Sequence, residues 1–131
     1  MVKIHNPELM SAKEVMDERG SLTVFELGKA LPFKPKRIFI ISQAPVGVSR
    51  GGHAHSRCSQ FFIATSGEIQ VTVTNRNATF NFNLNSNQVG LLLPALNWVE
   101  FTFSAPNTSA TVLASRKFER SDYIYDRKDI L

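Results

Sequence analysis

Two histidines at alternate positions are the side chains best suited to chemistry in this 131-residue sequence. His53 and His55 lie in the stretch Arg-Gly-Gly-His-Ala-His, directly before an apolar segment. If this stretch is extended, both imidazoles point to the same face, about 7 Å apart. An imidazole with an ordinary pKa of about 6.5 can accept and return protons at neutral pH. The spacing therefore predicts two proton-transfer groups, and it leaves open which of them is the base.

The segments around the histidines have the pattern of antiparallel strands. Phe80, Phe82 and Leu84 alternate with asparagines, which places the apolar side chains on one face of a strand. Turn residues separate about eight segments of this kind. The sequence therefore predicts an all-β fold, an antiparallel β-barrel or jelly roll, in which the face shared by the histidines can be the interior.

Two local patterns add further predictions. Ser66-Gly67 separates the apolar segments 60–65 and 68–74, which predicts a hairpin. Ser11-Ala12-Lys13-Glu14 matches a capping box, which predicts the first turn of a helix. The tail from 122 to 131 is compatible with a helix or a strand, since Tyr123 and Tyr125 alternate.

Length and composition indicate a single domain over residues 1–131. The net charge of +4 suits an anionic ligand, but no block of five like charges predicts a nucleic-acid tail or a polybasic membrane anchor. One cysteine, Cys58, excludes an internal disulfide framework. The start of the chain lacks the apolar core of a signal peptide, and the run 89–99 is too short to span a bilayer. We therefore expect a cytoplasmic protein that binds neither a membrane nor nucleic acid.

The spacing of Gly47, the two histidines and Gln60 resembles the first motif of the cupin superfamily, and residues 90–99 resemble the second. In this resemblance Gln60 stands where cupins carry a metal-binding glutamate, and Val99 stands where they carry a third histidine. A neutral amide cannot offset the charge of a dication, and valine offers no ligand atom. We therefore expect a barrel without a metal, in which the two histidines act as acid and base.

Longer stretches of the chain, from about residue 17 to 131, are similar to the nucleotide-sugar 3,4-ketoisomerases, small cupins that convert a dTDP-4-keto-6-deoxyhexose to its 3-keto isomer. The most specific stretch is Arg-Gly-Gly-His-Ala-His with the downstream glutamine. The resemblance implies that His53 and His55 are catalytic. The expected substrate-binding residues are Arg50, Gln60, Trp98 and Arg37, and all but Arg37 are expected to line one cavity with the histidines. It further implies a nucleotide-sugar substrate, no cofactor and a homodimer.

Some positions depart from this family. The family usually has tyrosines on the strand after the Lys-Arg pair, where this chain has Phe39, and a lysine where this chain has Ser56. A non-catalytic cupin that binds a nucleotide sugar or carbohydrate therefore remains an alternative. A nucleotide-sugar 3,5-epimerase is another, although that chemistry commonly needs a tyrosine acid and the two tyrosines of this chain lie in its tail. A nucleic-acid-binding barrel is disfavoured, because the aromatic residues alternate with Asn and Thr rather than Lys and Arg.

Overall fold

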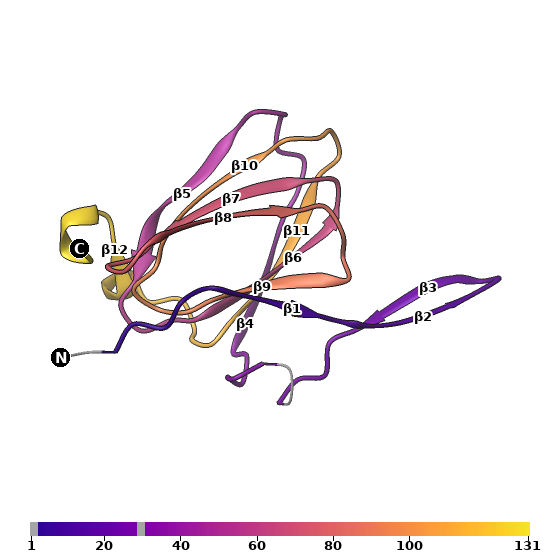
Figure 1. The fold of residues 1–131 in the computed structure, drawn as a ribbon, viewed down its shortest axis with the longest axis horizontal. Helices are drawn as coiled ribbons and strands as arrows, with labels where there is room; N and C mark the ends of the chain where they lie inside the picture. Colours follow the sequence, from indigo (N-terminus) through magenta and orange to yellow (C-terminus); the bar gives the residue numbers. More distant parts are fainter. Residues whose placement is uncertain (1–2, 29–30) are drawn as a thin grey trace.

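Two antiparallel β-sheets of five strands each face one another in the computed structural model, which describes residues 3–28 and 31–131 (Figure 1). The first sheet has the order β1-β9-β6-β11-β4 and the second the order β12-β5-β10-β7-β8. The strands of the first sheet are β1 (Glu8–Ser11), β9 (Val89–Leu93), β6 (Gln60–Ser66), β11 (Ser109–Ala114) and β4 (Arg37–Ile41). Those of the second are β12 (Tyr123–Ile124), β5 (Ser49–His55), β10 (Trp98–Phe103), β7 (Ile69–Thr74) and β8 (Thr79–Leu84). This arrangement confirms the all-β jelly roll.

The core lies between the two sheets, where the inward side chains of both meet. Phe62 and Ala64 of β6 pack in one cluster with Val71 and Val73 of β7. Alternate residues of each strand point to opposite faces, so one apolar residue in two is enough to fill this layer. The aromatic side chains of β8 pack against the same cluster, as their alternation with asparagine predicted.

The predicted hairpin around Ser66-Gly67 is wrong. Strand β6 pairs with β9 and β11, whereas β7 pairs with β10 and β8 in the other sheet. The connection crosses between the sheets at Gly67, whose φ is +76° and where a Cβ atom would overlap Thr108. The backbone N–H of Glu68 donates to the hydroxyl of Thr108 at 3.0 Å. This anchor explains why a turn-like pair of residues serves here as a crossing between the two sheets.

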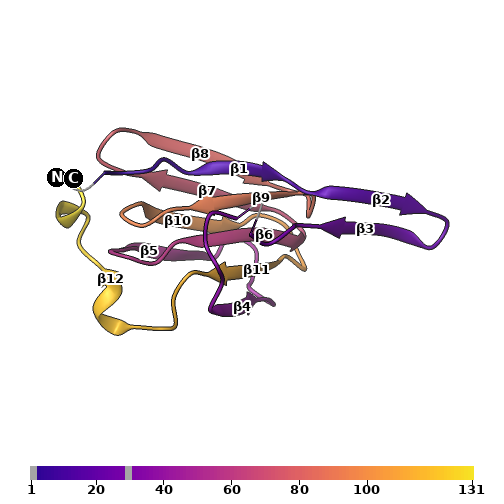
Figure 2. The ribbon, with the colours of Figure 1, turned by 90° about the horizontal axis from the view of Figure 1, so that it is seen from below.

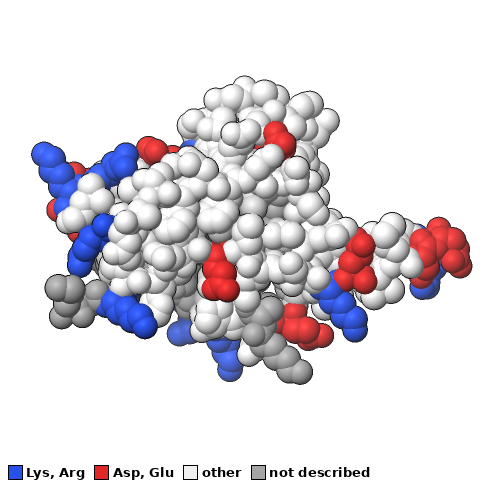
Figure 3. Space-filling view, in the orientation of Figure 1, with Lys and Arg blue, Asp and Glu red and all other residues white. Residues whose placement is uncertain are grey.

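The helical turn predicted at Ser11 to Glu14 is also wrong. Strands β2 (Lys13–Asp17) and β3 (Gly20–Val24) form a hairpin that projects from the sandwich (Figures 1 and 2). The carboxylate of Glu14 accepts a hydrogen bond from the hydroxyl of Ser21 across this hairpin at 2.9 Å, instead of capping a helix. Acidic side chains gather at the tip of the projecting arm (Figure 3).

The tail after β11 runs along the end of the sandwich opposite the projecting hairpin (Figure 1). It contains the short helices η1 (Arg120–Asp122) and η2 (Arg127–Asp129), both 3₁₀ turns, with β12 between them. The C-terminus lies at this end of the sandwich (Figure 1). Over the residues that the structure describes, no helix has the length and apolar character needed to cross a membrane.

Candidate active site

A β-bulge in β5 sets which side chains face the interior of the sandwich. His53 lies opposite Val99 of β10 and Arg50 lies opposite Phe101, so the four residues 50–53 of β5 span the three residues 99–101 of β10. Gly51 and Gly52 form the bulge with φ values of +90° and +75°, a region that favours glycine. The extra residue brings Arg50 and His53 to the same inner face, although strict alternation would place them on opposite faces.

A small cavity of about 160 Å³ opens beside this bulge, between the two sheets. Three of the expected site residues, Arg50, His53 and Gln60, lie in its wall. The rest of the wall is Tyr123, the glycine Gly51 and the apolar residues Phe39, Ile41, Phe62, Val99 and Phe101. The cavity therefore combines a few polar groups with a mostly apolar wall, which suits a bound small molecule.

His55 was expected to line the same cavity as His53, but it lies behind the cavity and is hydrogen-bonded to a buried carboxylate. Its Nδ1 lies 3.0 Å from Oδ2 of Asp122, and each residue is only 3% exposed. The other ring nitrogen, Nε2, is buried and has no hydrogen-bond partner among the residues that the structure describes. Asp122 also accepts hydrogen bonds from the backbone N–H groups of Arg57 at 2.7 Å and Cys58 at 3.3 Å, and from the hydroxyl of Ser56 at 3.0 Å. This set of donors holds the carboxylate in one position relative to the imidazole.

The environment keeps both imidazoles neutral at pH 7. Burial lowers the pKa of His53 below its usual 6.5, and a hydrogen bond to the backbone of Gly51 opposes this only in part. Burial lowers the pKa of His55 as well, and the charge of a protonated His53 lowers it further, against the opposing effect of Asp122. Burial alone would raise the pKa of Asp122, but the N–H of Arg57 and the other donors outweigh it and lower the pKa. The ionised Asp122 therefore accepts a hydrogen bond from the Nδ1–H of a neutral His55.

The tail brings two residues to the site that were not assigned from the sequence, Asp122 and Tyr123. Strand β12 pairs with β5 so that Tyr123 lies opposite His55. The Tyr123 ring centroid lies 4.4 Å from that of His55 and 5.1 Å from that of His53. The only local signal was the alternation of the two tail tyrosines, which is compatible with a strand but does not say which strand it joins.

Arg37 lies beside the cavity rather than in its wall. Its guanidinium lies 5.5 Å from the ring centre of Phe39, which lines the cavity, and 5.8 Å from that of Phe118. Within the described ranges 3–28 and 31–131, its buried Nε has no hydrogen-bond partner. The arginine therefore brings a positive charge close to the site, with part of its donor capacity unused.

Trp98 does not line the cavity as expected. It is 6% exposed and packs with Ala54, Ile124 and Ile130 on the opposite side of β10 from Val99. The reason is strand alternation: Val99 faces the core between the sheets, so its neighbour must face outward. The C-terminal residues cover Trp98 there, which leaves no free ring face for a sugar or a base.

The donor atoms near the histidines do not fit a bound metal. Val99 lies directly opposite His53 and offers no ligand, as its position in the sequence suggested. Among the described residues, His55, Cys58 and Asp122 place possible ligand atoms within 4.8 Å of one another. Both oxygens of this carboxylate, however, already accept hydrogen bonds. The cluster is a buried hydrogen-bond network.

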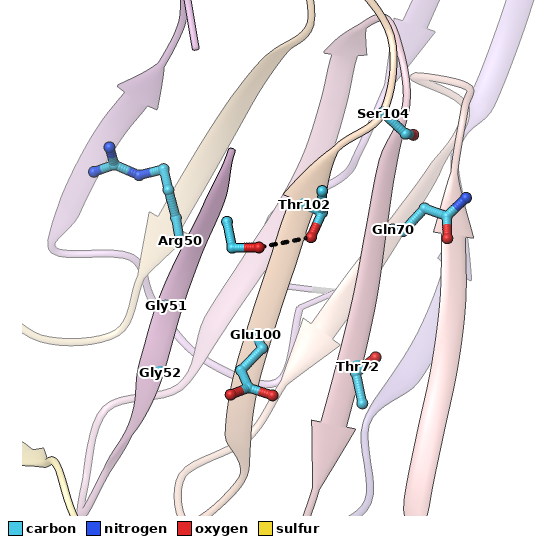
Figure 4. A pocket seen from close by; sticks show the side chains of 9 residues that line it. Arg50, Gly51, Gly52, Gln70, Thr72, Glu100, Thr102 and Ser104 are labelled. Atoms are coloured by element: carbon cyan, nitrogen blue, oxygen red, sulfur yellow. Dashed lines mark hydrogen bonds between the residues drawn. The ribbon is translucent and has the colours of Figure 1, made fainter. Parts of the chain in front are cut away.

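A second and larger hollow, of about 700 Å³, lies on the outer face of the second sheet (Figure 4). Its wall includes Glu100, Gln70 and Thr72, and the hydroxyls of Ser49 and Thr102 form a 3.0 Å hydrogen bond across it. The hollow contains one carboxylate and no imidazole. It therefore lacks the pair of proton-transfer groups, and the candidate active site is the inner cavity.

Comparisons with known proteins give the family of this chain. The family model "FdtA: WxcM-like, C-terminal" matches residues 5–131. The chain is 31% identical over 117 residues to a TDP-4-oxo-6-deoxy-alpha-D-glucose-3,4-oxoisomerase from Aneurinibacillus thermoaerophilus, covering 89% of this chain and 84% of that protein.

Two solved structures have almost the same fold. QdtA, a sugar 3,4-ketoisomerase from Thermoanaerobacterium thermosaccharolyticum solved with TDP, is 28% identical, with a TM-score of 0.90 over 97% of this chain and 93% of that one. WlaRB, a TDP-quinovose 3,4-ketoisomerase from Campylobacter jejuni, is 28% identical, with a TM-score of 0.89 over 96% of this chain and 97% of that one. The jelly roll, the inner cavity and the family match together show that this chain belongs to the FdtA family, of the WxcM-like, C-terminal type.

Proposed function

We propose that this protein is a sugar-nucleotide isomerase that converts a dTDP-4-keto-6-deoxyhexose to its 3-keto isomer without a metal or another cofactor. One observation carries the proposal: a neutral imidazole, that of His53, lies in the wall of a mostly apolar cavity in a chain of this family. The relatives named above are 3,4-ketoisomerases or 3,4-oxoisomerases of TDP-sugars. The reaction is redox-neutral within the substrate, so it needs no nicotinamide.

His53 is the general base in this proposal. Moving the ketone from carbon 4 to carbon 3 takes a proton from carbon 3 and returns one to carbon 4, through an enediol-type intermediate. An imidazole in contact with the sugar can make both transfers, and burial keeps it unprotonated and ready at neutral pH. Arg50 in the same wall supplies positive charge toward the oxygen on which negative charge develops.

His55 supports this base from behind. It is buried, its Nδ1 proton is held by Asp122, and its ring is packed edge-on against that of His53 at 5.1 Å between centroids. The contact restricts the orientation of His53. We therefore assign to His55 the role of a positioning residue that keeps the base aimed into the cavity.

Substrate binding is assigned to Arg50, Gln60 and Arg37. Gln60 is 3% exposed and offers amide donors and acceptors to the sugar hydroxyls from the cavity wall. The two arginines bring charges that match a diphosphate. Lysine and arginine side chains gather at the end of the molecule where the tail lies, which adds attraction for an anionic nucleotide sugar (Figure 3).

The test is to mix the protein with TDP-4-keto-6-deoxyglucose in deuterated water and to follow the sugar by NMR. We expect the 3-keto isomer to appear with deuterium at carbon 4. His53→Asn should lower kcat by about 10²–10⁴-fold, because asparagine keeps polarity but cannot move a proton. His5→Asn, at a histidine that does not line the cavity, is the matched control. A wild type that binds the nucleotide sugar but neither isomerises nor exchanges it would overturn the proposal in favour of a binding module.

The protein is also proposed to act as a homodimer, through the projecting β2–β3 hairpin. Val15 and Leu22, which pair across this hairpin, are 46% and 60% exposed, and Met16 on its other face is 70% exposed. Strand β4 exposes Ile38 and Ile40 at 61% and 67%. Apolar side chains on an arm that leaves its own sandwich are covered most simply by a second copy of the chain.

Light scattering on a sizing column tests this assembly. The wild type should have twice the mass of one chain, and Leu22→Lys on the arm should shift it toward the monomer. Asn83→Lys, on the exposed outer face of β8, is the control and should remain dimeric. A wild type that is monomeric at high concentration would contradict the dimer.

We place the reaction in the cytoplasm, in deoxysugar and polysaccharide biosynthesis, because the relatives act on activated TDP-sugars.

A further inference from the structure

Among the described residues that line the inner cavity, two side chains can both donate and accept a proton during catalysis. The polar groups there are Arg50, His53, Gln60 and Tyr123. A guanidinium stays protonated in proteins and an amide does not exchange its protons in catalysis. The remaining two, His53 and Tyr123, have ring centroids 5.1 Å apart.

Tyr123 is held in this position by the structure around it. Strand β12 pairs with β5, and the backbone N–H of Ser56 donates to the carbonyl of Asp122 at 2.8 Å. The side chain of Asp122, the residue before the tyrosine, accepts from the backbone N–H groups of Arg57 and Cys58. The phenol ring also packs against Phe118, with centroids 5.6 Å apart. The tail is therefore anchored immediately beside the tyrosine, which restricts where its hydroxyl can lie.

The proposed isomerisation needs two kinds of proton transfer. One proton moves between the carbons, from carbon 3 to carbon 4. A second moves between the oxygens, because the hydroxyl at carbon 3 becomes a ketone and the ketone at carbon 4 becomes a hydroxyl. His53 is assigned to the carbons, and an imidazole that holds the carbon proton cannot carry the oxygen proton at the same time.

We infer that Tyr123 is a further catalytic residue, which carries the proton between the two sugar oxygens; this rests on the proposed 3,4-ketoisomerase function. As His53 removes the proton from carbon 3, the electron pair of that C–H bond forms the carbon 3–carbon 4 double bond. The π pair of the carbon 4 ketone then takes the phenolic proton of Tyr123. In the second half, carbon 4 receives a proton from the imidazole, and the hydroxyl at carbon 3 returns its proton to the phenolate. Both residues end in their starting states.

The structure also shows why this role falls on the tail. Strand β4 contributes Phe39 and Ile41 to the cavity wall, and neither carries a hydroxyl. Among the residues of the wall, Tyr123 has the only phenol. In the lining of this cavity, the hydroxyl of Tyr123 is therefore the group available to carry a proton between the sugar oxygens.

The test compares Tyr123→Phe with Tyr125→Phe. The first keeps the ring that packs on the imidazoles and removes only the hydroxyl. The second makes the same change on a neighbouring tyrosine of the tail that is 70% exposed. For both, kcat and KM with TDP-4-keto-6-deoxyglucose, affinity for TDP and the unfolding temperature should be measured.

We expect Tyr123→Phe to lower kcat by about 10²–10⁴-fold, with TDP affinity and unfolding temperature close to wild type. Tyr125→Phe should stay within about threefold of wild type. If the wild type is active and Tyr123→Phe is equally active, the role of Tyr123 is overturned and the proposed isomerase function stands. A wild type without isomerase activity would overturn the proposed function together with the inference.

Discussion

Replacing Gly51 by alanine should break the bulge that directs Arg50 and His53 into the cavity. A Cβ atom at this position would lie 2.6 Å from the carbonyl oxygen of Val99 and 3.3 Å from its carbonyl carbon. These are backbone atoms of the paired strand β10, so they cannot rotate away. The φ of +90° adds a second cost, because residues with a Cβ atom rarely adopt it.

Gly52→Ala is a matched control, because it has the same unfavourable backbone conformation as Gly51→Ala but not the overlap of the Cβ atom with β10. Its φ is +75°, but its Cβ atom would meet nothing within 4 Å. The left-handed conformation alone costs about 1–2 kcal/mol for a residue with a side chain. Overlap with a packed neighbour adds about 1–3 kcal/mol. We therefore expect Gly51→Ala to lose about 2–5 kcal/mol of unfolding free energy and Gly52→Ala about 1–2 kcal/mol.

Thermal unfolding, monitored by circular dichroism at one protein concentration, measures this difference. For a chain of this length, 1 kcal/mol corresponds to about 3–5 °C, so Gly51→Ala should melt about 3–15 °C below Gly52→Ala. Isomerase activity below both transitions should also fall more in Gly51→Ala, because the strand must shift to relieve the overlap. Equal melting temperatures and activities for the two variants would refute the claim that close approach to β10 sets this bulge.

Three further predictions concern the charges and ligands of the site. Because burial lowers the pKa of His53, the unfolded chain binds more protons than the folded chain just below pH 6.5, so the unfolding free energy should hold above pH 6.5 and fall as the pH drops below it. The kcat/KM should fall only as the pH drops through the lowered pKa of folded His53, and a His53→Asn variant whose unfolding free energy keeps the full wild-type pH dependence would contradict this. Asp122→Asn should lose about 1–3 kcal/mol in urea denaturation and lower kcat, because both carboxylate oxygens accept hydrogen bonds and an NH₂ group in place of one of them cannot, whereas Asp129→Asn at an exposed position should change neither. Elemental analysis of untagged protein should find less than stoichiometric zinc, iron or manganese, and chelation should leave the activity intact; a bound metal whose removal abolishes activity would refute the metal-free site.

Several features of the site could be predicted from the sequence because they depend on local geometry. The alternation of Phe80 and Phe82 with asparagine places these rings inward in any strand, and the structure places them against the core. The shared face of His53 and His55 follows from the same two-residue period. Gln60 and Val99 were recognised by their spacing in a motif, and both line the cavity.

Other features depend on which strands pair with each other, and the local sequence of a strand does not indicate its partner. Arg50 is an odd number of residues from His53, so alternation alone would place it on the other face; only the bulge against β10 brings it inward. Trp98 is an expected substrate-binding residue by resemblance, but its neighbour Val99 occupies the inner face and the C-terminal residues cover the tryptophan. In both cases the partner strand or segment decided the outcome.

The sequence by itself determined the strand character of the chain, the shared face of the two histidines and the loss of the cupin metal ligands. Only the tertiary structure decided that Asp122 and Tyr123 belong to the site, because β12 reaches β5 across 67 or more residues of intervening chain. It also separated β6 and β7 into different sheets, against a turn sequence that favours a hairpin. The physical reason is that alternation comes from the geometry of a single strand, whereas the pairing of distant strands comes from burying both sheets against one core.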